Sequence, residues 1–293
     1  MNNGKKTAFL LEGGGMRGLY TAGVLDVFLD ENIETDCILG VSAGALFSTN
    51  YKSRQRGRTL RYNLKYVNDK NYMSLYSLIT TGDLVNREFC YITIPTQLDI
   101  FDNETYMSTP EDFYCVVTNI ETGEAEYIKL TDLAEQMDTL RASGSLPFVS
   151  RPVEVNGKKY LDGGIADSIP IEKIIEMGYE KIVVVLTRHG NYRKEEKGMA
   201  PAKIFYRKYP RLVEALNKRN SEYNRQIEIV NKLEKEGRIF VIRPSEELKL
   251  SRIEKDTEKL QAVYDVGIKD AKAWRFCMSL FRSQSIPLHS FGI

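Results

Sequence analysis

Two short apolar runs, each ended by glycine and each followed by a helical pattern, constrain most strongly what this chain can fold into. The runs are Thr7–Leu11 and Cys37–Val41, and apolar residues at helical spacing follow in Gly18–Asn32 and from Ala43 onward. Short, continuously apolar runs suit strands that are buried on both faces of a sheet. The alternation of strand and helix therefore predicts an α/β fold with a mostly parallel sheet.

Later segments continue this pattern toward the C-terminus. Asn156-Gly157 lies between two short apolar runs, which is a strong signal for a hairpin turn. Segment 52–103 has a mixed helical and loop pattern. The chain shows no internal repeat or linker, so we expect a single domain over 1–293, with 200–293 as a helical C-terminal extension packed on the rest. The further predicted strands are Phe113–Thr118, Glu124–Lys129, Pro152–Val155, Lys159–Leu161, Lys181–Thr187 and Arg238–Ile242. The further predicted helices are Asp132–Arg141, Ala202–Lys218, Glu222–Glu236 and Lys255–Phe281.

Composition limits the class of protein. Hydrophobic residues make up 42% and charged residues 28% of the chain, as in ordinary globular domains, and a net charge of +1 selects no partner by its overall field. No apolar stretch reaches the roughly 18 residues of a membrane span, and the N-terminal apolar run is too short for a signal peptide. The four cysteines are widely spaced, which is typical of a reducing compartment. We therefore expect a cytoplasmic protein. The sequence contains no motif of a nucleic-acid-binding module, so we expect no nucleic-acid partner.

Two charge runs and one mixed segment bear on the surface of the protein. Tyr51–Lys70 has seven Lys or Arg against one Asp, and 99–140 has eleven Asp or Glu against one Lys. Solvated surfaces explain most such runs, but a basic run can also meet an anionic head group or a membrane surface. Segment 203–219 mixes aromatic and basic residues. It is either an amphipathic helix docked on the core or a membrane-peripheral surface.

The glycine-rich segment 12–18, between the first strand and the first helix, is suited to hold an anion. Glycine tolerates positive φ and lets backbone N–H groups approach a ligand, and a helix N-terminus favours negative charge. Gly13, Gly15 and Gly18 also match the G-x-G-x-x-G pattern of dinucleotide-binding folds. That pattern needs an acidic residue at the end of the second strand, whereas Asp36 precedes the second strand here. We therefore favour another anion over a dinucleotide, and no cofactor is implied.

A second glycine-flanked site follows the second apolar run. Gly40, Ser42 and Gly44 match G-x-S-x-G, in which a serine occupies a strained turn between a strand and a helix. Large side chains at the two glycine positions would clash where the strand and the helix meet. The pattern is weak alone, but its place between a strand and a helix predicts that Ser42 is a nucleophile above a helix N-terminus.

A serine nucleophile requires a base that takes its proton. Asp162 begins an Asp-Gly-Gly sequence after the second run of the predicted hairpin. Such a sequence is usually only a turn, and it gains weight here because the first two sites require a base. The chain has no calcium-loop pattern and only two histidines, so we expect no metal.

These three sites, in this order, resemble the patatin-like phospholipases. The resemblance rests on Gly13–Gly18, Gly40–Gly44 and Asp162–Gly164, and segments 142–147 and 167–170 are also similar to bacterial members of that family. It covers residues 7–188. It implies a three-layer α/β/α fold with a mostly parallel central sheet. It also implies a lipid acyl hydrolase, of the phospholipase A or carboxylesterase type, whose substrate is a lipid or another acyl ester.

Carried onto this sequence, the resemblance implies a catalytic dyad in which Ser42 is the nucleophile and Asp162 is the base. It implies an oxyanion hole made by the backbone N–H groups of Gly14 and Gly15. We expect the N–H of Ala43 to add to that hole. Arg17 lies beside it, where it either stiffens the glycine loop or attracts a phosphate head group.

The residues leave alternatives open. Ser42, Asp162 and His189 stand in the chain order of a serine–acid–histidine triad, so an esterase or thioesterase that uses His189 is one alternative. His289 lies in the C-terminal tail, and we assign it no role. Asp167 is a second candidate acid, which we expect instead to order the loop that follows it. A catalytically silent lipid-binding protein is the non-enzymatic alternative, and the sequence indicates no oligomeric state.

Overall fold

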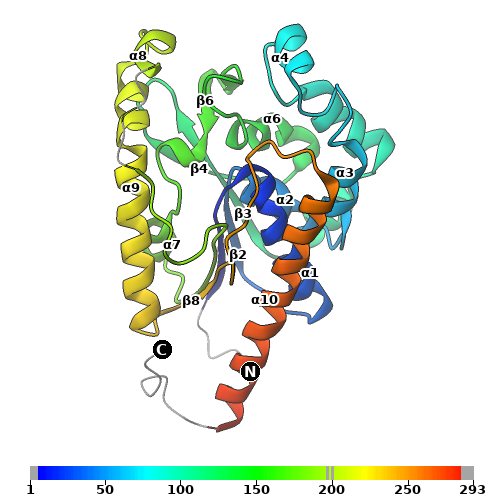
Figure 1. The fold of residues 1–293 in the computed structure, drawn as a ribbon, viewed down its shortest axis with the longest axis vertical. Coiled ribbons are helices and arrows are strands. Elements are labelled where there is room, and N and C mark those ends of the chain that lie inside the picture. Colours follow the sequence, from blue (N-terminus) through cyan, green and yellow to red (C-terminus); the bar gives the residue numbers. More distant parts are fainter. Residues whose placement is uncertain (1–5, 196–197, 199–200, 285–293) are drawn as a thin grey trace.

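An eight-stranded sheet forms the centre of the protein, whose computed structural model describes residues 6–195, 198 and 201–284 (Figure 1). The strand order is β5-β6-β3-β2-β1-β7-β8, and β4 also pairs with β3. The mutually parallel strands are β1 (Thr7–Leu11), β2 (Cys37–Val41), β3 (Asp112–Asn119), β7 (Lys181–Val185) and β8 (Ile239–Ile242). The antiparallel pairings involve β4 (Ala125–Lys129), β5 (Val153–Val155) and β6 (Lys158–Asp162). The predicted mostly parallel sheet is therefore confirmed.

Helices cover both faces of the sheet. Phe9 and Leu11 of β1 pack into one apolar core with α1 (Gly18–Asp30), α2 (Ala43–Lys52) and α10 (Thr257–Gln284). The alternate residues Ala8 and Leu10 pack into a second core with α7 (Ile171–Glu176) and α9 (Pro210–Lys235). Successive side chains of a strand point to opposite faces, which is why one apolar run supplies two cores. Figure 1 shows α9 on one side of the strands and α1 and α10 on the other, so the three-layer α/β/α architecture is confirmed.

The C-terminal part of the chain adds to both layers and to the sheet. β8 extends the sheet by pairing with β7, and α10 lies along α1. The two helices approach closely at Gly23 and Gly267, where a Cβ atom would meet the backbone carbonyl of the opposite helix. The Tyr264 hydroxyl donates a 2.6 Å hydrogen bond to Asp26 across the same interface. That residues 200–293 form one domain with the rest of the chain stays a prediction.

The remaining helices follow the segments between the strands. Segment 52–103 is helical and loop-like, as expected, and includes a π-helical stretch. It holds α3 (Arg58–Tyr66), α4 (Leu75–Thr81) and the π-helix η2 (Phe89–Leu98). α5 (Asn103–Ser108) begins at its end, and α6 (Leu133–Ser143) lies between β4 and β5. Two short 3₁₀ turns complete the described part of the fold: η1 (Gly15–Arg17) comes three residues after β1, and η3 (Gly163–Ile165) follows β6 directly.

Local turn chemistry decides two boundaries. Asn156 and Gly157 have φ values of 51° and 75°, so the predicted hairpin turn between β5 and β6 is confirmed. The single helix predicted over 202–218 is wrong, because α8 (Ala202–Phe205) ends before Pro210 and α9 begins there. Proline lacks a backbone N–H and fits the first turn of a helix, so it starts α9. α9 then continues unbroken to Lys235, where we had expected two helices.

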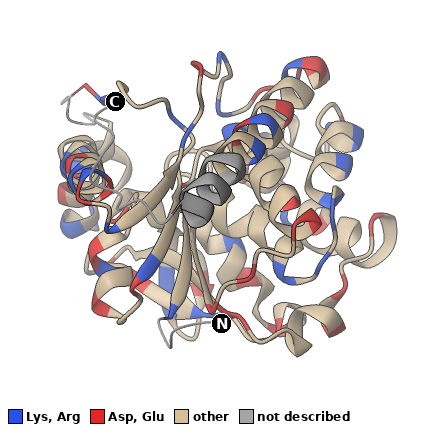
Figure 2. Cartoon of the chain, turned by 90° about the horizontal axis from the view of Figure 1, so that it is seen from below, with Lys and Arg blue, Asp and Glu red and all other residues tan. Residues whose placement is uncertain are grey.

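The basic run 51–70 is compensated by acidic residues from other segments. Arg54 pairs with Glu111, and Asp99 accepts from Arg58 at 3.1 Å and from Arg61 at 2.8 Å. Both carboxylates belong to the acidic run 99–140, so that run compensates part of the basic run. Figure 2 shows charged residues of both signs spread over the outer helices. That the run 51–70 meets an anionic surface stays a prediction.

Candidate active site

Ser42 occupies a strained turn between β2 and α2. Its backbone lies at φ 53° and ψ −125°, in a region that non-glycine residues rarely adopt and that marks functional turns. A Cβ atom at Gly40 would lie 2.5 Å from the Cα of Ala45, and one at Gly44 would meet the carbonyl oxygen of Leu11. Only glycine fits at these two positions, so the predicted G-x-S-x-G turn between strand and helix is present.

The register of β3 brings Asp162 to Ser42. Val41 of β2 pairs with Val116, and Asp162 of β6 pairs with the next residue, Val117. β4 occupies the opposite edge of β3 at both positions, so β2 and β6 lie end to end along one edge. The Ser42 hydroxyl consequently donates a 2.6 Å hydrogen bond to the Oδ2 of Asp162.

The carboxylate of Asp162 is held in a fixed orientation away from solvent. Asp162 is 2% exposed, and its Oδ1 accepts a 2.8 Å hydrogen bond from the Gly164 N–H. Burial raises the pKa of Asp162 above the ordinary value, against the opposing effects of Arg219 and the Ser42 hydrogen bond. A raised pKa makes a carboxylate a stronger base, which suits it to accept a proton from a serine.

The glycine loop packs directly against Ser42. A Cβ atom at Gly13 would lie 2.7 Å from the Cβ of Ser42, and Gly15 has a φ of +59°. The backbone N–H groups of Gly14 and Gly15 donate no hydrogen bond to another backbone group in the described part of the chain. Both glycines line a cavity together with Ser42 and Asp162. The loop therefore places free amides beside the hydroxyl–carboxylate pair.

Ser143 supports the turn in a way that the sequence did not reveal. It is fully buried at the end of α6, its hydroxyl accepts a 3.0 Å hydrogen bond from the Ser42 N–H, and it donates a 2.7 Å bond to the Val116 carbonyl. The side chain thus ties the Ser42 backbone to β3. Segment 142–147 attracted notice only through its family resemblance, which carried no role for this residue.

The other candidate residues lie apart from the pair. His189 is half-buried, its ring lies 6.4 Å from that of Tyr192, and it does not line the cavities on either side of Ser42. Asp167 accepts 2.6 Å hydrogen bonds from the Tyr127 hydroxyl and the Gln226 amide, so it orders the loop before α7. His289 lies outside the described residues. The only acidic partner that the described residues place on the Ser42 hydroxyl is Asp162.

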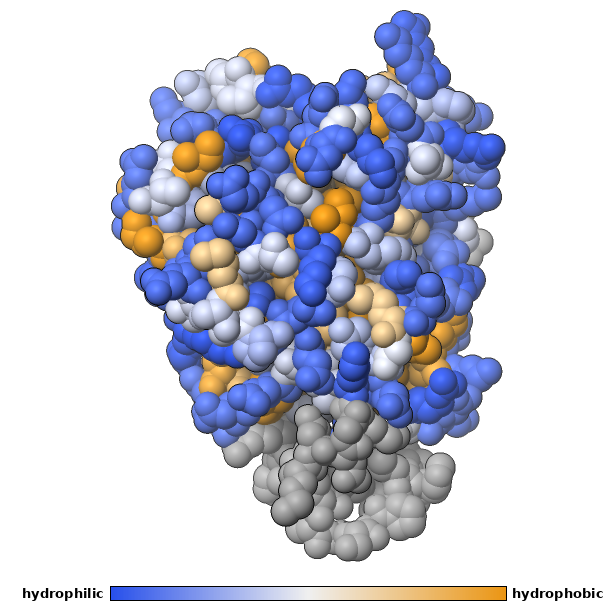
Figure 3. Space-filling model, turned by 180° about the vertical axis from the view of Figure 1, so that it is seen from behind, coloured by the Kyte–Doolittle hydropathy of each residue, from blue (hydrophilic) through white to orange (hydrophobic). Residues whose placement is uncertain are grey.

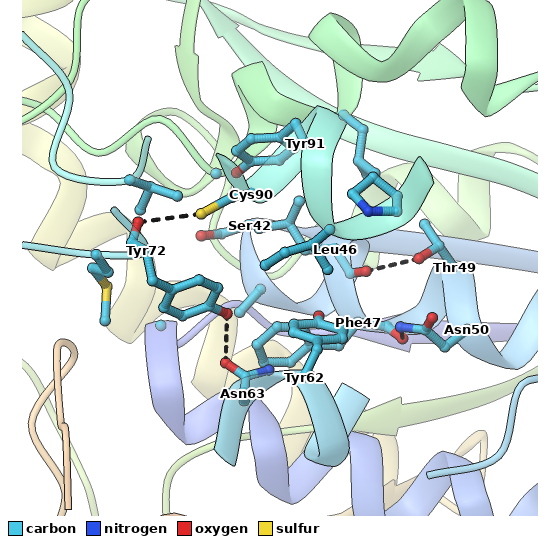
Figure 4. Close-up of a pocket in the computed structure, with 18 of the residues that line it drawn as sticks. Ser42, Leu46, Phe47, Thr49, Asn50, Tyr62, Asn63, Tyr72, Cys90 and Tyr91 are labelled. Atoms are coloured by element: carbon cyan, nitrogen blue, oxygen red, sulfur yellow. Dashed lines mark hydrogen bonds between the residues drawn. The ribbon is translucent and has the colours of Figure 1, made fainter. Parts of the chain in front are cut away.

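An apolar cavity opens on one side of Ser42 (Figure 4). It holds about 1040 Å³ of empty space, part of it open to solvent, and Leu46, Phe47, Tyr72 and Tyr91 surround the serine. The Tyr72 hydroxyl donates a 2.8 Å hydrogen bond to Asn63, so this polar group is satisfied within the wall. Such a wall suits a hydrocarbon chain.

A basic cavity opens on the other side of Ser42, beside the glycine loop. It is smaller than the apolar cavity, with about 500 Å³ of empty space, and more basic than acidic side chains line it. Of these basic residues the sequence analysis singled out only Arg17. The cationic residues that line it are Arg17, Arg188, Lys194, Arg219 and Arg252. The carboxylates that line it are Glu12 and Asp162.

Two negative findings apply to the residues that the structure describes. None of their histidine, cysteine, aspartate and glutamate side chains gather in threes as a metal site would require. None of the helices within 6–195 and 201–284 combines the length and the apolar character that crossing a membrane demands.

The fold and the site define a class of α/β proteins in which a serine on a strand–helix turn lies next to a buried carboxylate. A family model described as patatin-like phospholipase matches residues 9–175, which is more than half of the chain. The chain therefore belongs to the patatin-like phospholipase family. A second model, described as a domain of unknown function (DUF6363), matches residues 209–274, from α9 into α10.

Relatives carry names that point to lipid hydrolysis. An uncharacterized protein YjjU of Escherichia coli is 28% identical over 62% of this chain and 52% of its own length. Lysophospholipase nte1 of Aspergillus niger is 27% identical over 62% of this chain and 12% of its own length. A probable lipid hydrolase 463L of invertebrate iridescent virus 6 is 25% identical over 63% of this chain and 71% of its own length. The chain thus matches about half of the bacterial relative and a small part of the fungal one.

Proposed function

We propose that this protein is a lipid acyl hydrolase, of the phospholipase A or carboxylesterase type, that works through a Ser42–Asp162 dyad. The observation that carries the proposal is the 2.6 Å hydrogen bond from the Ser42 hydroxyl to a buried carboxylate, next to free backbone amides. Membership of the patatin-like phospholipase family supports a lipid ester as the substrate. The apolar cavity beside Ser42 offers a place for the acyl chain.

The reaction proceeds in two steps. Asp162 accepts the hydroxyl proton of Ser42 while the serine oxygen attacks the ester carbonyl, and the alcohol leaves with that proton to give an acyl-enzyme. Water then attacks the acyl-enzyme while Asp162 accepts its proton. As the bond between the acyl carbon and the Ser42 oxygen breaks, Asp162 returns this proton to Ser42 and the fatty acid is released. A positioned base of this kind contributes about 10²–10⁴-fold to the rate.

The negative charge that develops on the carbonyl oxygen needs hydrogen-bond donors. Gly14 and Gly15 supply backbone N–H groups on the cavity side of the loop, and Ala43 supplies one at the N-terminus of α2. Loss of one such donor typically costs about 10²–10³ in kcat. We assign the oxyanion hole to these three amides, with Gly13 and Gly18 as the small residues that allow the loop to approach Ser42 and Ala43.

Labelling and substitution test the proposal against both alternatives. A fluorophosphonate probe should label wild-type protein at Ser42, and Ser42→Ala should lose both labelling and hydrolysis of a neutral p-nitrophenyl ester. A folded protein that is neither labelled nor active would be a silent lipid-binding protein. His189→Ala should keep most of the activity. A loss as large as that of Ser42→Ala would instead establish a triad with His189.

Exposed apolar side chains support a peripheral contact with membranes. Leu75 and Ile79 of α4 are 67% and 76% exposed, and Ile204 and Phe205 of α8 are 77% and 65% exposed. Figure 1 places α4 and α8 at the same end of the molecule. On the face shown in Figure 3, apolar side chains form only small, separate patches between polar ones. Apolar tips at one end suit shallow insertion into a lipid interface.

Vesicle binding tests this contact. Leu75→Ser with Ile79→Ser should weaken co-sedimentation with phosphatidylcholine vesicles, and so should Ile204→Ser with Phe205→Ser. Ile100→Ser is the matched control, because Ile100 is 59% exposed and lies on neither helix. Equal binding by all these variants would exclude the contact through α4 and α8.

A further inference from the structure

We infer that the basic cavity beside Ser42 binds a phosphate monoester group, so that acyl esters with a terminal phosphate head group are the preferred substrates. This inference rests on the proposed function and specifies the substrate of the same site. Its basis is a group of five cationic side chains, defined here as the cationic cluster. The members of the cationic cluster are Arg17, Arg188, Lys194, Arg219 and Arg252.

The two carboxylates in the cavity do not neutralise the cationic cluster. Asp162 is engaged by the Ser42 hydroxyl and the Gly164 N–H. The Oε2 of Glu12 accepts from the Thr187 N–H at 2.7 Å and from the Thr187 hydroxyl at 3.2 Å. Among the described residues, no ion pair within 4.0 Å joins either carboxylate to a member of the cluster. The cluster therefore has an excess of positive charge that an anion would balance.

Buried donors in the cavity lack acceptors. Arg17 is 5% exposed, its Nε has no hydrogen-bond partner among the described residues, and one terminal nitrogen makes only a 3.4 Å contact with the Leu250 carbonyl. The Tyr223 hydroxyl lies near Glu12 but, within the described structure, is likewise without a hydrogen bond of good geometry. Unpaired buried donors cost free energy, and phosphate oxygens are the acceptors that several convergent guanidinium groups bind best.

Burial and mutual repulsion disfavour the charged forms of Arg17 and Lys194. Burial, with Arg188 and Arg252 nearby, lowers the pKa of Arg17 to about 10. The pKa of Lys194 is lowered still more, by burial first and then by Arg219, against a smaller raising effect of Glu12. A dianion in the cavity would reverse the repulsion, and Lys194 would then bind as an ammonium.

The cavity disfavours a choline-type head group. Quaternary ammonium ligands are recognised by exposed aromatic faces. Here the Arg188 guanidinium lies 4.1 Å from the centre of the Tyr192 ring, and the Lys194 amine lies 3.6 Å from the centre of the Tyr223 ring. Both aromatic faces are covered by the protein's own basic side chains. The cavity therefore distinguishes a phosphate monoester, with up to two negative charges, from a zwitterionic phosphocholine.

The position of Ser42 sets the order of groups along the substrate. Ser42 lines both cavities: apolar side chains predominate in one, and the cationic cluster lines the other, with Arg252 at the boundary of the two. An acyl chain in the apolar cavity and a phosphate in the basic cavity place the ester between them at the hydroxyl. Four of the five cluster residues come from positions 188–252, beyond the matched segment 9–175. The C-terminal part of the chain thus confers head-group selectivity on the dyad.

Competing substrates test the inference. We would measure kcat/KM for 1-oleoylglycerol 3-phosphate, 1-oleoylglycerol and 1-oleoylglycero-3-phosphocholine in micelles of one neutral detergent. The phosphate-headed substrate should be preferred over both others by about ten- to a hundredfold, as charge-assisted hydrogen bonds allow. Equal kcat/KM values for the three substrates would overturn the inference.

Substitutions in the cationic cluster should erase that preference. Lys194→Gln and Arg252→Gln should each reduce the ratio of the phosphate-headed to the neutral substrate about tenfold. Lys235→Gln is the matched control, because Lys235 is exposed at the far end of α9, and its ratio should equal that of wild type. Unfolding midpoints and labelling of Ser42 identify any variant that fails to fold. Unchanged ratios in the folded cluster variants would refute the assignment.

Inorganic phosphate separates a head group from a free ion. It should competitively inhibit hydrolysis of 1-oleoylglycerol by wild type, more weakly in Lys194→Gln, whereas chloride at equal ionic strength should not. Inhibition by phosphate without any preference for the phosphate-headed lipid would overturn the head-group assignment. Failure of the proposed function is distinguishable, because it would abolish labelling of Ser42 and hydrolysis of all three substrates, whereas failure of this inference would leave both intact.

Discussion

The backbone N–H of Ser42 donates a 3.0 Å hydrogen bond to the hydroxyl of Ser143, 101 residues further along the chain. The Ser143 hydroxyl in turn donates a 2.7 Å hydrogen bond to the carbonyl oxygen of Val116. The bond therefore links the strained turn that carries the hydroxyl to β3, the strand whose register also places Asp162. A turn with positive φ persists only when its surroundings determine it, and Ser143 is one of those determinants.

Replacing Ser143 by alanine should weaken both stability and catalysis. Ser143→Ala leaves the Ser42 N–H and the Val116 carbonyl without their buried partner, which should reduce the free energy of unfolding by about 1–3 kcal/mol. Because the turn loses an anchor, kcat/KM for a neutral ester should fall roughly 10–100-fold. Urea unfolding and steady-state kinetics measure the two effects.

Ser145→Ala provides the comparison for that variant. The Ser145 hydroxyl donates to the Arg141 carbonyl, four residues earlier, and makes no hydrogen bond to Ser42 or β3 within the described structure. Its loss should leave kcat/KM within about twofold of wild type. If the two alanine variants behave alike, Ser143 has no special role at the turn.

Gly13→Ala should damage the site by steric contact alone. Gly13 has an ordinary backbone φ, so alanine brings no conformational penalty, but its Cβ would lie 2.7 Å from that of Ser42 and 2.9 Å from the Val41 carbonyl. The glycine loop or the Ser42 turn must shift, and kcat should fall about 10²-fold or more.

Gly178→Ala separates this effect from general destabilisation. Gly178 has a φ of +84° with no atom within 4 Å of an added Cβ, so the substitution strains the backbone by about 1–2 kcal/mol far from the site. Its unfolding midpoint should drop while kcat stays at the wild-type value. Similar kcat values for the two variants would contradict the close approach of the loop to Ser42.

The local part of this architecture could be predicted from the sequence, because it depends on neighbours in the chain. Apolar runs and glycines defined β1, β2 and the Ser42 turn, and Asn156-Gly157 defined the hairpin of β5 and β6. The family resemblance then named Asp162, and the structure brings its carboxylate to the Ser42 hydroxyl.

The rest depends on contacts between distant segments, for which no local pattern exists. Ser143 reaches Ser42 only because α6 ends against β3, and nothing in the residues around it signals that bond. Lys194, Arg219 and Arg252 converge because the segment after β7, the helix α9 and the segment before α10 meet beside the glycine loop. Each of these three residues reads as an ordinary surface cation in the sequence.

Asp162→Asn should trade activity for stability. Asparagine keeps an oxygen for the Gly164 N–H but cannot accept a proton, so kcat should fall about 10²–10⁴-fold. Burial raises the pKa of Asp162, so the folded state binds this proton more tightly than the unfolded state does. Wild-type stability therefore falls as pH rises from the unfolded pKa through the folded pKa, and the asparagine variant escapes this loss.

Unfolding free energies at two pH values test that trade. At pH 7 the Asp162→Asn variant should be more stable than wild type, and the difference should shrink at a pH below the ordinary carboxyl value of about 4. A wild type that is the more stable protein at pH 7 would mean that hydrogen bonds to the ionised carboxylate outweigh its burial.

The pH dependence of kcat/KM should report the same carboxylate. Asp162 must be ionised to accept the Ser42 proton, and its pKa is raised, so activity should rise with pH through a limb above the ordinary value of about 4. Arg219 opposes the raised pKa by its charge and anchors the neighbourhood through a 2.6 Å bond to the Gly164 carbonyl. Removing the positive charge of Arg219 raises the pKa of Asp162 further, so Arg219→Leu should move the rising limb of the kcat/KM profile to higher pH. Arg211→Leu, at an exposed position of the same helix, should leave the limb in place, and a shift of equal size in both variants would exclude a specific effect of Arg219 on the base.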